Sequence, residues 1–237
     1  MVVRFQSDEE DSGGNSGTGT FIVIVAVVVG VLYLFTVHFP SGKEPEIAAN
    51  PPANNAAGPA SDCWLGQPCV PAFSQCDPAW KDMRYGDGSM CANGCGPAAM
   101  AMIITALTGK RVTPDATAAY ATANGQYFYD QYGRGHGSKH TIPAVLAPHW
   151  GLRAVKLRQT EADVKNAIAQ GGLVIIAGNT RAPFTPAGHY IVVRAVKPDG
   201  SVVIGNSALP DTNNRTWNLG TEILPIARET SIYAIFR

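Results

Sequence analysis

A cysteine at the start of a predicted helix is the first position at which this sequence could carry out chemistry. Cys95 lies in an Asn-Gly-Cys-Gly-Pro segment, residues 93–97, where a loop gives way to an apolar run that continues to Leu107. The free amides and the dipole of a helix N-terminus stabilise an anion, and they lower the pKa of a cysteine placed there. The segment therefore predicts a thiolate nucleophile at Cys95. The alternatives are a structural buried cysteine and a disulfide partner for Cys91.

A thiolate nucleophile needs a base, and His189 is the predicted one among the five histidines. It begins a predicted strand that is followed by a Pro-Asp-Gly turn at 198–200 and a second strand. Residues whose numbers sum to about 397 face each other across such a hairpin, and His189 and Asn206 come close to that sum. The Asn206 amide would then accept a hydrogen bond from the imidazole and fix its tautomer. Asp211 is the second candidate for this orienting role, and a plain turn residue is the alternative interpretation of Asn206.

Acyl transfer also requires donors for the oxyanion that develops on the substrate carbonyl. The backbone amide of Cys95 is one candidate. A side-chain amide from an upstream loop could supply the second, and Gln75 is placed suitably before the nucleophile. Taken alone, Gln75 would be read as a surface residue.

The elements that must position these residues follow an order of helices first and strands afterwards. Such an order favours the α+β class, with an antiparallel sheet. Helices are expected at 96–107, with Gly109 as a stop, at 113–124, at 142–149 and at 161–169. Residues 126–139 are expected to be a Gly- and Tyr-rich loop, and residues 127–140 either a mobile lip over the cleft or a plain surface loop. Strands are expected at 152–157, 173–177, 190–196, 201–204 and 232–236.

The N-terminal part of the chain has a different composition. Residues 1–20 are polar and acidic and predict a disordered tail. Residues 21–38 form an apolar run without a charge, which reaches the length of a single membrane-spanning helix. A cleaved secretory signal is the alternative, although the preceding region is long and acidic rather than short and basic. Residues 39–62 predict a Pro/Ala/Asn-rich linker, and residues 63–237 the folded domain.

Five cysteines are too many to pair completely within one chain. The interpretation that fits best is two disulfides and one free reactive thiol, Cys95. The pairing Cys63–Cys69 with Cys76–Cys91 is favoured, although four cysteines allow three pairings and the sequence does not choose. Disulfides persist in oxidising compartments, so the domain is expected on the extracytoplasmic side of the membrane. Five reduced cysteines are the alternative.

Composition argues against two further classes of partner. The formal net charge is zero and no block of Lys and Arg is present, so a nucleic-acid partner is not expected. The spacings of Cys91 with Cys95 and of His136 with His140 would allow a zinc ion. The usual paired Cys-x-x-Cys signatures are absent, however, so no metal or other cofactor is expected.

Several short motifs, taken together in one order, resemble the bacteriocin-processing (double-glycine leader) peptidase family. The similarity is closer to its stand-alone, peptidase C39-like branch of papain-like enzymes, and it covers Phe73 to the C-terminus. It rests on Gln75, Asp-Pro-x-Trp at 77–80, Tyr85-Gly86, Gly-Cys-Gly-Pro at 94–97 and Gly-His-Tyr at 188–190.

The resemblance implies a papain-like fold with Cys95 as nucleophile, His189 as base, Asn206 as orienting residue and Gln75 in the oxyanion hole. Two features depart from the family pattern. The relatives usually carry Asp-Pro where this chain has Asn206-Ser207, and the four additional cysteines do not belong to the pattern. No transporter regions are found, so export of a bacteriocin is not expected.

These observations predict a membrane-anchored cysteine peptidase or amide hydrolase, single-pass in the bacterial inner membrane, with its catalytic domain in the periplasm. The expected substrate is a peptide or protein, including the peptide part of peptidoglycan, and a secretion or envelope complex is an expected setting. Transfer to an amine instead of water would use the same site. The alternative function is a catalytically idle module that binds or assembles such a complex.

Overall fold

The computed structural model describes residues 22–23, 35–36, 68–129, 135–179, 183, 188–209, 212–213 and 215–237. The chain divides into two units, Met1–Asn55 and Ala56–Arg237. In the first unit, β1 (Ile22–Val23) pairs antiparallel with β2 (Phe35–Thr36). The predicted membrane helix at 21–38 otherwise falls outside the described residues. Within the described ranges, no helix combines the length and the apolar character that crossing a bilayer requires.

The second unit is built on a six-stranded sheet in which every neighbouring pair of strands is antiparallel. The strand order is β11-β10-β9-β8-β12-β7. The strands are β7 (Arg153–Lys156), β8 (Leu173–Gly178), β9 (His189–Val196), β10 (Val202–Asn206), β11 (Thr216–Trp217) and β12 (Ala227–Phe236).

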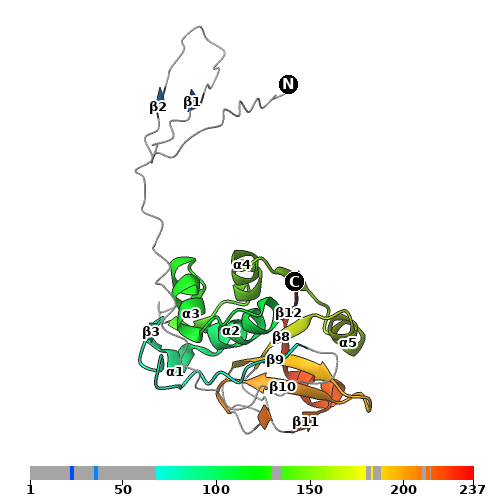
Figure 1. Ribbon diagram of the computed structural model, residues 1–237. Coiled ribbons are helices and arrows are strands. Elements are labelled where there is room, and N and C mark those ends of the chain that lie inside the picture. The colour runs from blue at the N-terminus through cyan, green and yellow to red at the C-terminus, as the bar shows by residue number, and fades with distance from the viewer. Residues whose placement is uncertain are drawn as a thin grey trace. The chain divides into compact units, whose positions relative to one another are not determined.

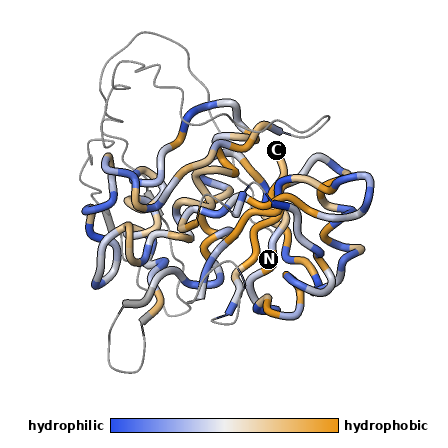
Figure 2. Tube along the Cα trace, turned by 90° about the horizontal axis from the view of Figure 1, so that it is seen from below, coloured by the Kyte–Doolittle hydropathy of each residue, from blue (hydrophilic) through white to orange (hydrophobic). Residues whose placement is uncertain are grey.

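Both faces of this sheet are buried, which explains the continuous apolar runs of its central strands. In β8, Leu173 and Ile175 belong to one hydrophobic cluster, whereas Val174 and Ile176 belong to the other. Successive side chains of a strand point to opposite faces, so a strand covered on both sides is apolar throughout. Figure 2 shows the resulting concentration of hydrophobic residues along the strands and the central helix.

Helices cover the two faces of the sheet (Figure 1). Side chains of α2 (Cys95–Thr108), α3 (Pro114–Ala123) and α4 (Ile142–His149) join the first cluster. Side chains of α5 (Glu161–Ala169), the π-helical turn η2 (Leu219–Ile223) and the short 3-10 helix η3 (Leu224–Ile226) join the second. The predicted α+β class, with helices packed on an antiparallel sheet, is confirmed.

Several short elements were not predicted, among them β11, η2 and η3 as well as two hairpins and one helix. Strand β3 (Arg84–Tyr85) pairs with β4 (Gly88–Ser89), which leads into α1 (Met90–Asn93). Strand β5 (Tyr127–Tyr129) pairs with β6 (Gly135–Ser138).

The interpretation of residues 126–139 as a loop was therefore wrong. The hairpin is held by contacts with distant parts of the chain: the Tyr85 hydroxyl lies 2.8 Å from the Ser138 hydroxyl, and the Tyr85 and Tyr127 rings meet edge to face. Local sequence patterns do not report such contacts.

Candidate active site

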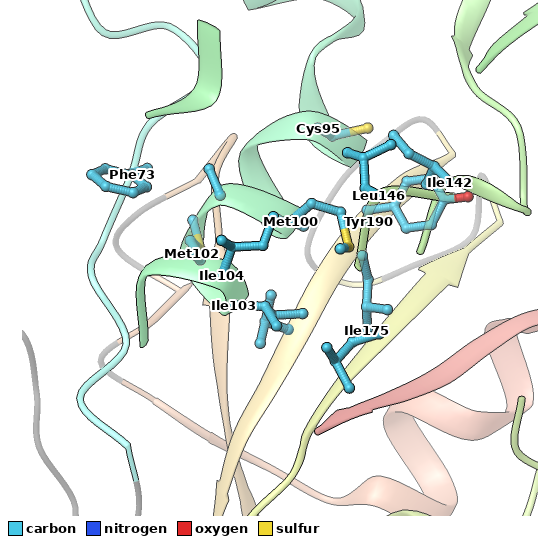
Figure 3. Packing of buried hydrophobic residues seen from close by; sticks show 14 of the residues in the cluster. Phe73, Cys95, Met100, Met102, Ile103, Ile104, Ile142, Leu146, Ile175 and Tyr190 are labelled. Atoms are coloured by element: carbon cyan, nitrogen blue, oxygen red, sulfur yellow. The ribbon is translucent and has the colours of Figure 1, made fainter. Parts of the chain in front are cut away.

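Cys95 is the first residue of α2, and the preceding turn is shaped for its position there. Gly94 forms the N-cap of α2, and a Cβ atom at Gly94 would lie 2.4 Å from the Met90 carbonyl oxygen. At Gly96 a Cβ atom would lie 2.4 Å from the Ser138 hydroxyl. Only glycine permits this close approach on both sides of the cysteine. Figure 3 shows Cys95 at the edge of the cluster that the rest of α2 fills.

The Cys95 thiol and the His189 imidazole line the same groove and are close enough for each to shift the pKa of the other. Burial alone would raise the pKa of Cys95, but the hydrogen bond and charge of His189, and the backbone amides of Tyr190 and Gly96, lower it overall. Burial alone would lower the pKa of His189, but the hydrogen bond and charge of Cys95 and the hydrogen bond of Asn206 raise it. The two shifts have opposite signs, so they favour a thiolate–imidazolium pair.

Asn206 holds the other side of the imidazole. Its Oδ1 lies 2.7 Å from His189 Nε2, which leaves Nδ1 for the thiol. The predicted hairpin register is confirmed: Asn206 pairs with Ile191, two residues from His189 along β9.

The orientation of the Asn206 amide is itself fixed, and the side chain is only 1% exposed. Oδ1 also accepts hydrogen bonds from the backbone amides of Ala208 and Leu209, and Nδ2 donates to Thr212 Oγ1 at 2.9 Å. The oxygen therefore faces the imidazole and the nitrogen faces away from it. Asp211, the second candidate, lies outside the described residues.

Gln75 lies between α1 and the turn after β10, and hydrogen bonds to both hold it. Its Nε2 donates to the Cys91 carbonyl oxygen at 2.7 Å, its Oε1 accepts from the Ser207 hydroxyl at 3.0 Å, and its backbone amide donates to the Ser207 carbonyl. Ser207 is thus a residue whose role the sequence interpretation missed. The departure from Asp-Pro was the available signal, because a hydroxyl can make this bond and a proline cannot.

The disulfide pattern agrees with the favoured pairing where it is described. Cys76 and Cys91 are joined, with Cα atoms 4.2 Å apart. Cys69 is also disulfide-bonded, and its predicted partner, Cys63, lies outside the described residues. Cys95 is a free buried cysteine. The Cys76–Cys91 bond ties the residue after Gln75 to α1, the element that leads into Cys95.

A groove of about 420 Å³ opens beside the cysteine–histidine pair. Helix α1, the β5–β6 hairpin, β8, the start of β9 and the start of β12 all contribute residues to its walls. Sequence reasoning did not single out two of these residues: Phe128, which is 51% exposed, and Arg228. No sequence pattern marked either of them, since both reach the groove through the tertiary fold.

The described residues contain no group of three or more His, Cys, Asp and Glu side chains placed to hold a metal ion. Cys91, which the alternative zinc site required, is bonded to Cys76. At Cys95 the structure brings together a free buried thiol, an imidazole, an amide that accepts a hydrogen bond from that imidazole, and an adjacent groove.

Comparison with known proteins gives one family match. The sequence matches the Peptidase_C39 like family over residues 69–223. Eleven chains of solved structures match. One of them is the crystal structure of the peptidase domain of Streptococcus ComA, a bi-functional ABC transporter involved in a quorum sensing pathway. It has 17% sequence identity and a TM-score of 0.42, and the match covers 61% of this chain and 90% of that one. No curated protein matches the sequence.

Proposed function

The chain belongs to the Peptidase_C39 like family, and from this membership and the geometry around Cys95 we propose that it is a cysteine peptidase using a Cys-His-Asn mechanism. The observation that carries the proposal is the grouping of three side chains at one groove: the free Cys95 thiol, the neighbouring His189 imidazole, and Asn206, whose Oδ1 lies 2.7 Å from His189 Nε2. In this grouping the pKa of the thiol is lowered and that of the imidazole is raised. A protein that only binds a partner does not require these three side chains to lie next to one another.

In the first half of the reaction, the Cys95 thiolate attacks the carbonyl carbon of the scissile amide. The carbonyl oxygen becomes an oxyanion, which the backbone amide of Cys95 and the side-chain amide of Gln75 stabilise. Gln75 Nε2 carries two hydrogens, and one of them is engaged by Cys91. The protonated His189 then gives its proton to the leaving amine as the C–N bond breaks, which leaves a thioester on Cys95.

In the second half, water attacks the thioester carbonyl. Neutral His189 takes a proton from the water, the C–S bond breaks, and the thiolate–imidazolium pair forms again. Asn206 keeps Nε2 hydrogen-bonded throughout, so the ring presents Nδ1 to the sulfur and the substrate. An amine could replace water at this step and give transfer instead of hydrolysis.

We further propose that the enzyme works in the bacterial cell envelope. The apolar run at 21–38 would anchor it in the inner membrane, and the linker at 39–62 would restrict it to nearby peptide, protein or peptidoglycan substrates. The Cys76–Cys91 disulfide supports an oxidising compartment on the periplasmic side. A single-pass anchor predicts that the full-length chain stays in the membrane fraction after alkaline carbonate extraction, whereas a chain lacking residues 1–38 does not.

The pH dependence of iodoacetamide alkylation tests the active-site proposal. The full-length chain, purified in mild detergent without reductant, is alkylated from pH 4 to 9 and the modified cysteine is located by peptide mass. We expect iodoacetamide to alkylate Cys95 rapidly at pH values well below the ordinary thiol pKa of about 8.5. In His189→Ala, alkylation of Cys95 should become rapid only as the pH approaches that ordinary thiol pKa. If the unaltered protein reacts only near pH 8.5, the site is not activated and the function as a binding module is favoured.

A further inference from the structure

The groove beside Cys95 carries positive charge on one wall and no carboxylate among its described lining residues. Arg228 and His140 line it together with the Cys95–His189 pair. The whole chain has a formal net charge of zero, so this excess is local to the groove. A cleft lined by one sign of charge attracts ligands of the other sign.

Arg228 brings its charge close to the proposed base. It lies at the start of β12, and a Cβ atom at Gly188, the residue before His189, would lie 3.9 Å from Arg228 Nη2. Arg228 is exposed and lines the groove at this position. No ion pair between described residues involves Arg228, so its charge is available to a ligand.

His140 stands next to Arg228 as a neutral partner. Its Nδ1 lies 2.6 Å from Thr230 Oγ1, which holds the ring in one orientation. Burial lowers the pKa of His140, and the charge of Arg228 lowers it further. The imidazole is therefore neutral near pH 7, and Arg228 supplies the fixed charge of this wall.

We propose that Arg228 binds a carboxylate of the substrate close to the scissile bond, beside His140 and Gly188. The planar guanidinium matches a carboxylate with two parallel hydrogen bonds. This carboxylate belongs either to an Asp or Glu side chain or to the C-terminus of the substrate. The inference rests on the proposed peptidase function and specifies its substrates as peptides with a carboxylate close to the scissile bond.

Irreversible labels of Cys95 distinguish the two sources of the carboxylate. Peptidyl chloromethyl ketones lose chloride to the thiolate and place their residues on the acyl side of the site. They are made with Glu or Gln at each of the positions before the ketone. Bromoacetyl peptides lose bromide and extend toward the leaving-group side, and they are made with a free or an amidated C-terminus. The second-order labelling rate of Cys95 is measured for each pair on the full-length protein.

We expect one pair to show a preference of about ten-fold for the carboxylate over its amide, as a charge-assisted hydrogen bond provides. Arg228→Gln should remove that preference, and Arg228→Glu should shift it to a lysine-bearing label. Arg153→Gln is the matched control, because Arg153 lies on the same sheet opposite Phe236, at the far end of β12. It should leave the preference unchanged.

Equal rates for the carboxylate and amide labels in both series would overturn the proposal, as would a preference that persists in Arg228→Gln. The comparison is also made at about pH 8.5, where an ordinary thiol is partly ionised. It therefore gives a result even if Cys95 is not activated. A failure of the peptidase function appears instead in the pH dependence of alkylation by iodoacetamide.

Discussion

At the scale of single residues, the Asn206 amide helps to set the protonation of His189. The neighbouring Cys95 raises the pKa of His189 most, and the hydrogen bond that the imidazole donates to Asn206 Oδ1 raises it further. Asn206 can accept this bond because its neighbours fix which of its two amide atoms faces the ring. In the proposed mechanism, this bond widens the pH range in which a thiolate–imidazolium pair is stable.

Replacing Asn206 by Ala should narrow the pH range of the pair from both ends. Without the Oδ1 acceptor the imidazolium is less stable, so the pKa of His189 falls and that of Cys95 rises. The acid limb of the iodoacetamide profile should move to higher pH, and peptidase activity should fall by about ten- to a hundred-fold, the range of one hydrogen bond to a charged group. Asn206→Asp is the control: it keeps the acceptor, and its negative charge raises the pKa of His189, so peptidase activity should persist to higher pH. The same charge opposes formation of the Cys95 thiolate, so the acid limb should not move to lower pH. An unchanged profile in Asn206→Ala would remove Asn206 from the mechanism.

Replacing Ser207 by Ala should weaken oxyanion binding without changing the thiolate. The Ser207 hydroxyl donates to Gln75 Oε1, and both side chains are buried. Loss of that donor frees the Gln75 amide to rotate. A peptide aldehyde, whose adduct with Cys95 places an oxygen in the proposed oxyanion hole, should bind about ten-fold more weakly. The iodoacetamide rate should stay constant.

The control for Ser207 is a double-mutant cycle with Gln75→Ala. Because Ser207 is argued to act through Gln75, adding Ser207→Ala to Gln75→Ala should cause little further loss of aldehyde affinity. Additive losses would show that Ser207 affects the site by another route.

Sequence reasoning could propose Gln75, Cys95, His189 and Asn206 because each belongs to a short motif or a hairpin register. It did not propose Ser207: the departure from Asp-Pro marked the position, but its partner Gln75 lies 132 residues away in the chain.

At the scale of elements, the Cys76–Cys91 disulfide couples the segment that carries Gln75 to α1, directly ahead of Cys95. The hydrogen bond from Gln75 Nε2 to the Cys91 carbonyl spans the same two segments. The covalent bond and the hydrogen bond therefore both fix the Gln75 segment against α1. We infer that the disulfide positions the proposed oxyanion hole as well as stabilising the fold.

Replacing Cys76 and Cys91 together by Ser should lower the free energy of unfolding by about 3 kcal/mol, the loop-entropy value for a closed loop of this size. It should also weaken binding of the peptide aldehyde, while Cys95 keeps its reactivity toward iodoacetamide at low pH. Urea unfolding and aldehyde inhibition measure the two effects. Replacing Cys63 and Cys69 by Ser is the matched control, which should affect stability alone. Equal losses of aldehyde affinity in both variants would contradict the positioning role.

The larger elements were predictable because their patterns are local. The run of α2 ends at Gly109, whose left-handed backbone closes the helix, and β8 is a continuous apolar strand. The β5–β6 hairpin was not predictable, since its stability depends on Tyr85. Three groove residues, Phe128, Gly137 and Ser138, come from this hairpin. The strand pairing that places them was missed because it is built by tertiary contacts.

At the scale of the whole domain, one sheet supports two hydrophobic clusters, and only one of them lies under the cysteine helix. Ile175 and Ile176 are adjacent in β8 and both are fully buried, but they face opposite sides. Ile175 packs in the cluster that contains α2 (Figure 3), whereas Ile176 packs in the cluster that contains α5. This pair allows stability and active-site geometry to be separated experimentally.

Replacing either isoleucine by Ala should lower the free energy of unfolding by about 2–5 kcal/mol, because each leaves a cavity in a close-packed core. Both clusters are built on the same sheet, so urea unfolding should remain a single transition in both variants. Circular dichroism and the accessibility of Cys95 should therefore change at the same urea concentration. Under native conditions, only Ile175→Ala should alter the aldehyde affinity of Cys95, since a cavity beneath α2 lets the helix that carries the nucleophile shift. Separate unfolding transitions in Ile176→Ala would contradict this and show that the two layers fold independently. If Ile176→Ala lowered aldehyde affinity as much as Ile175→Ala does, the sheet would transmit the disturbance from one face to the other.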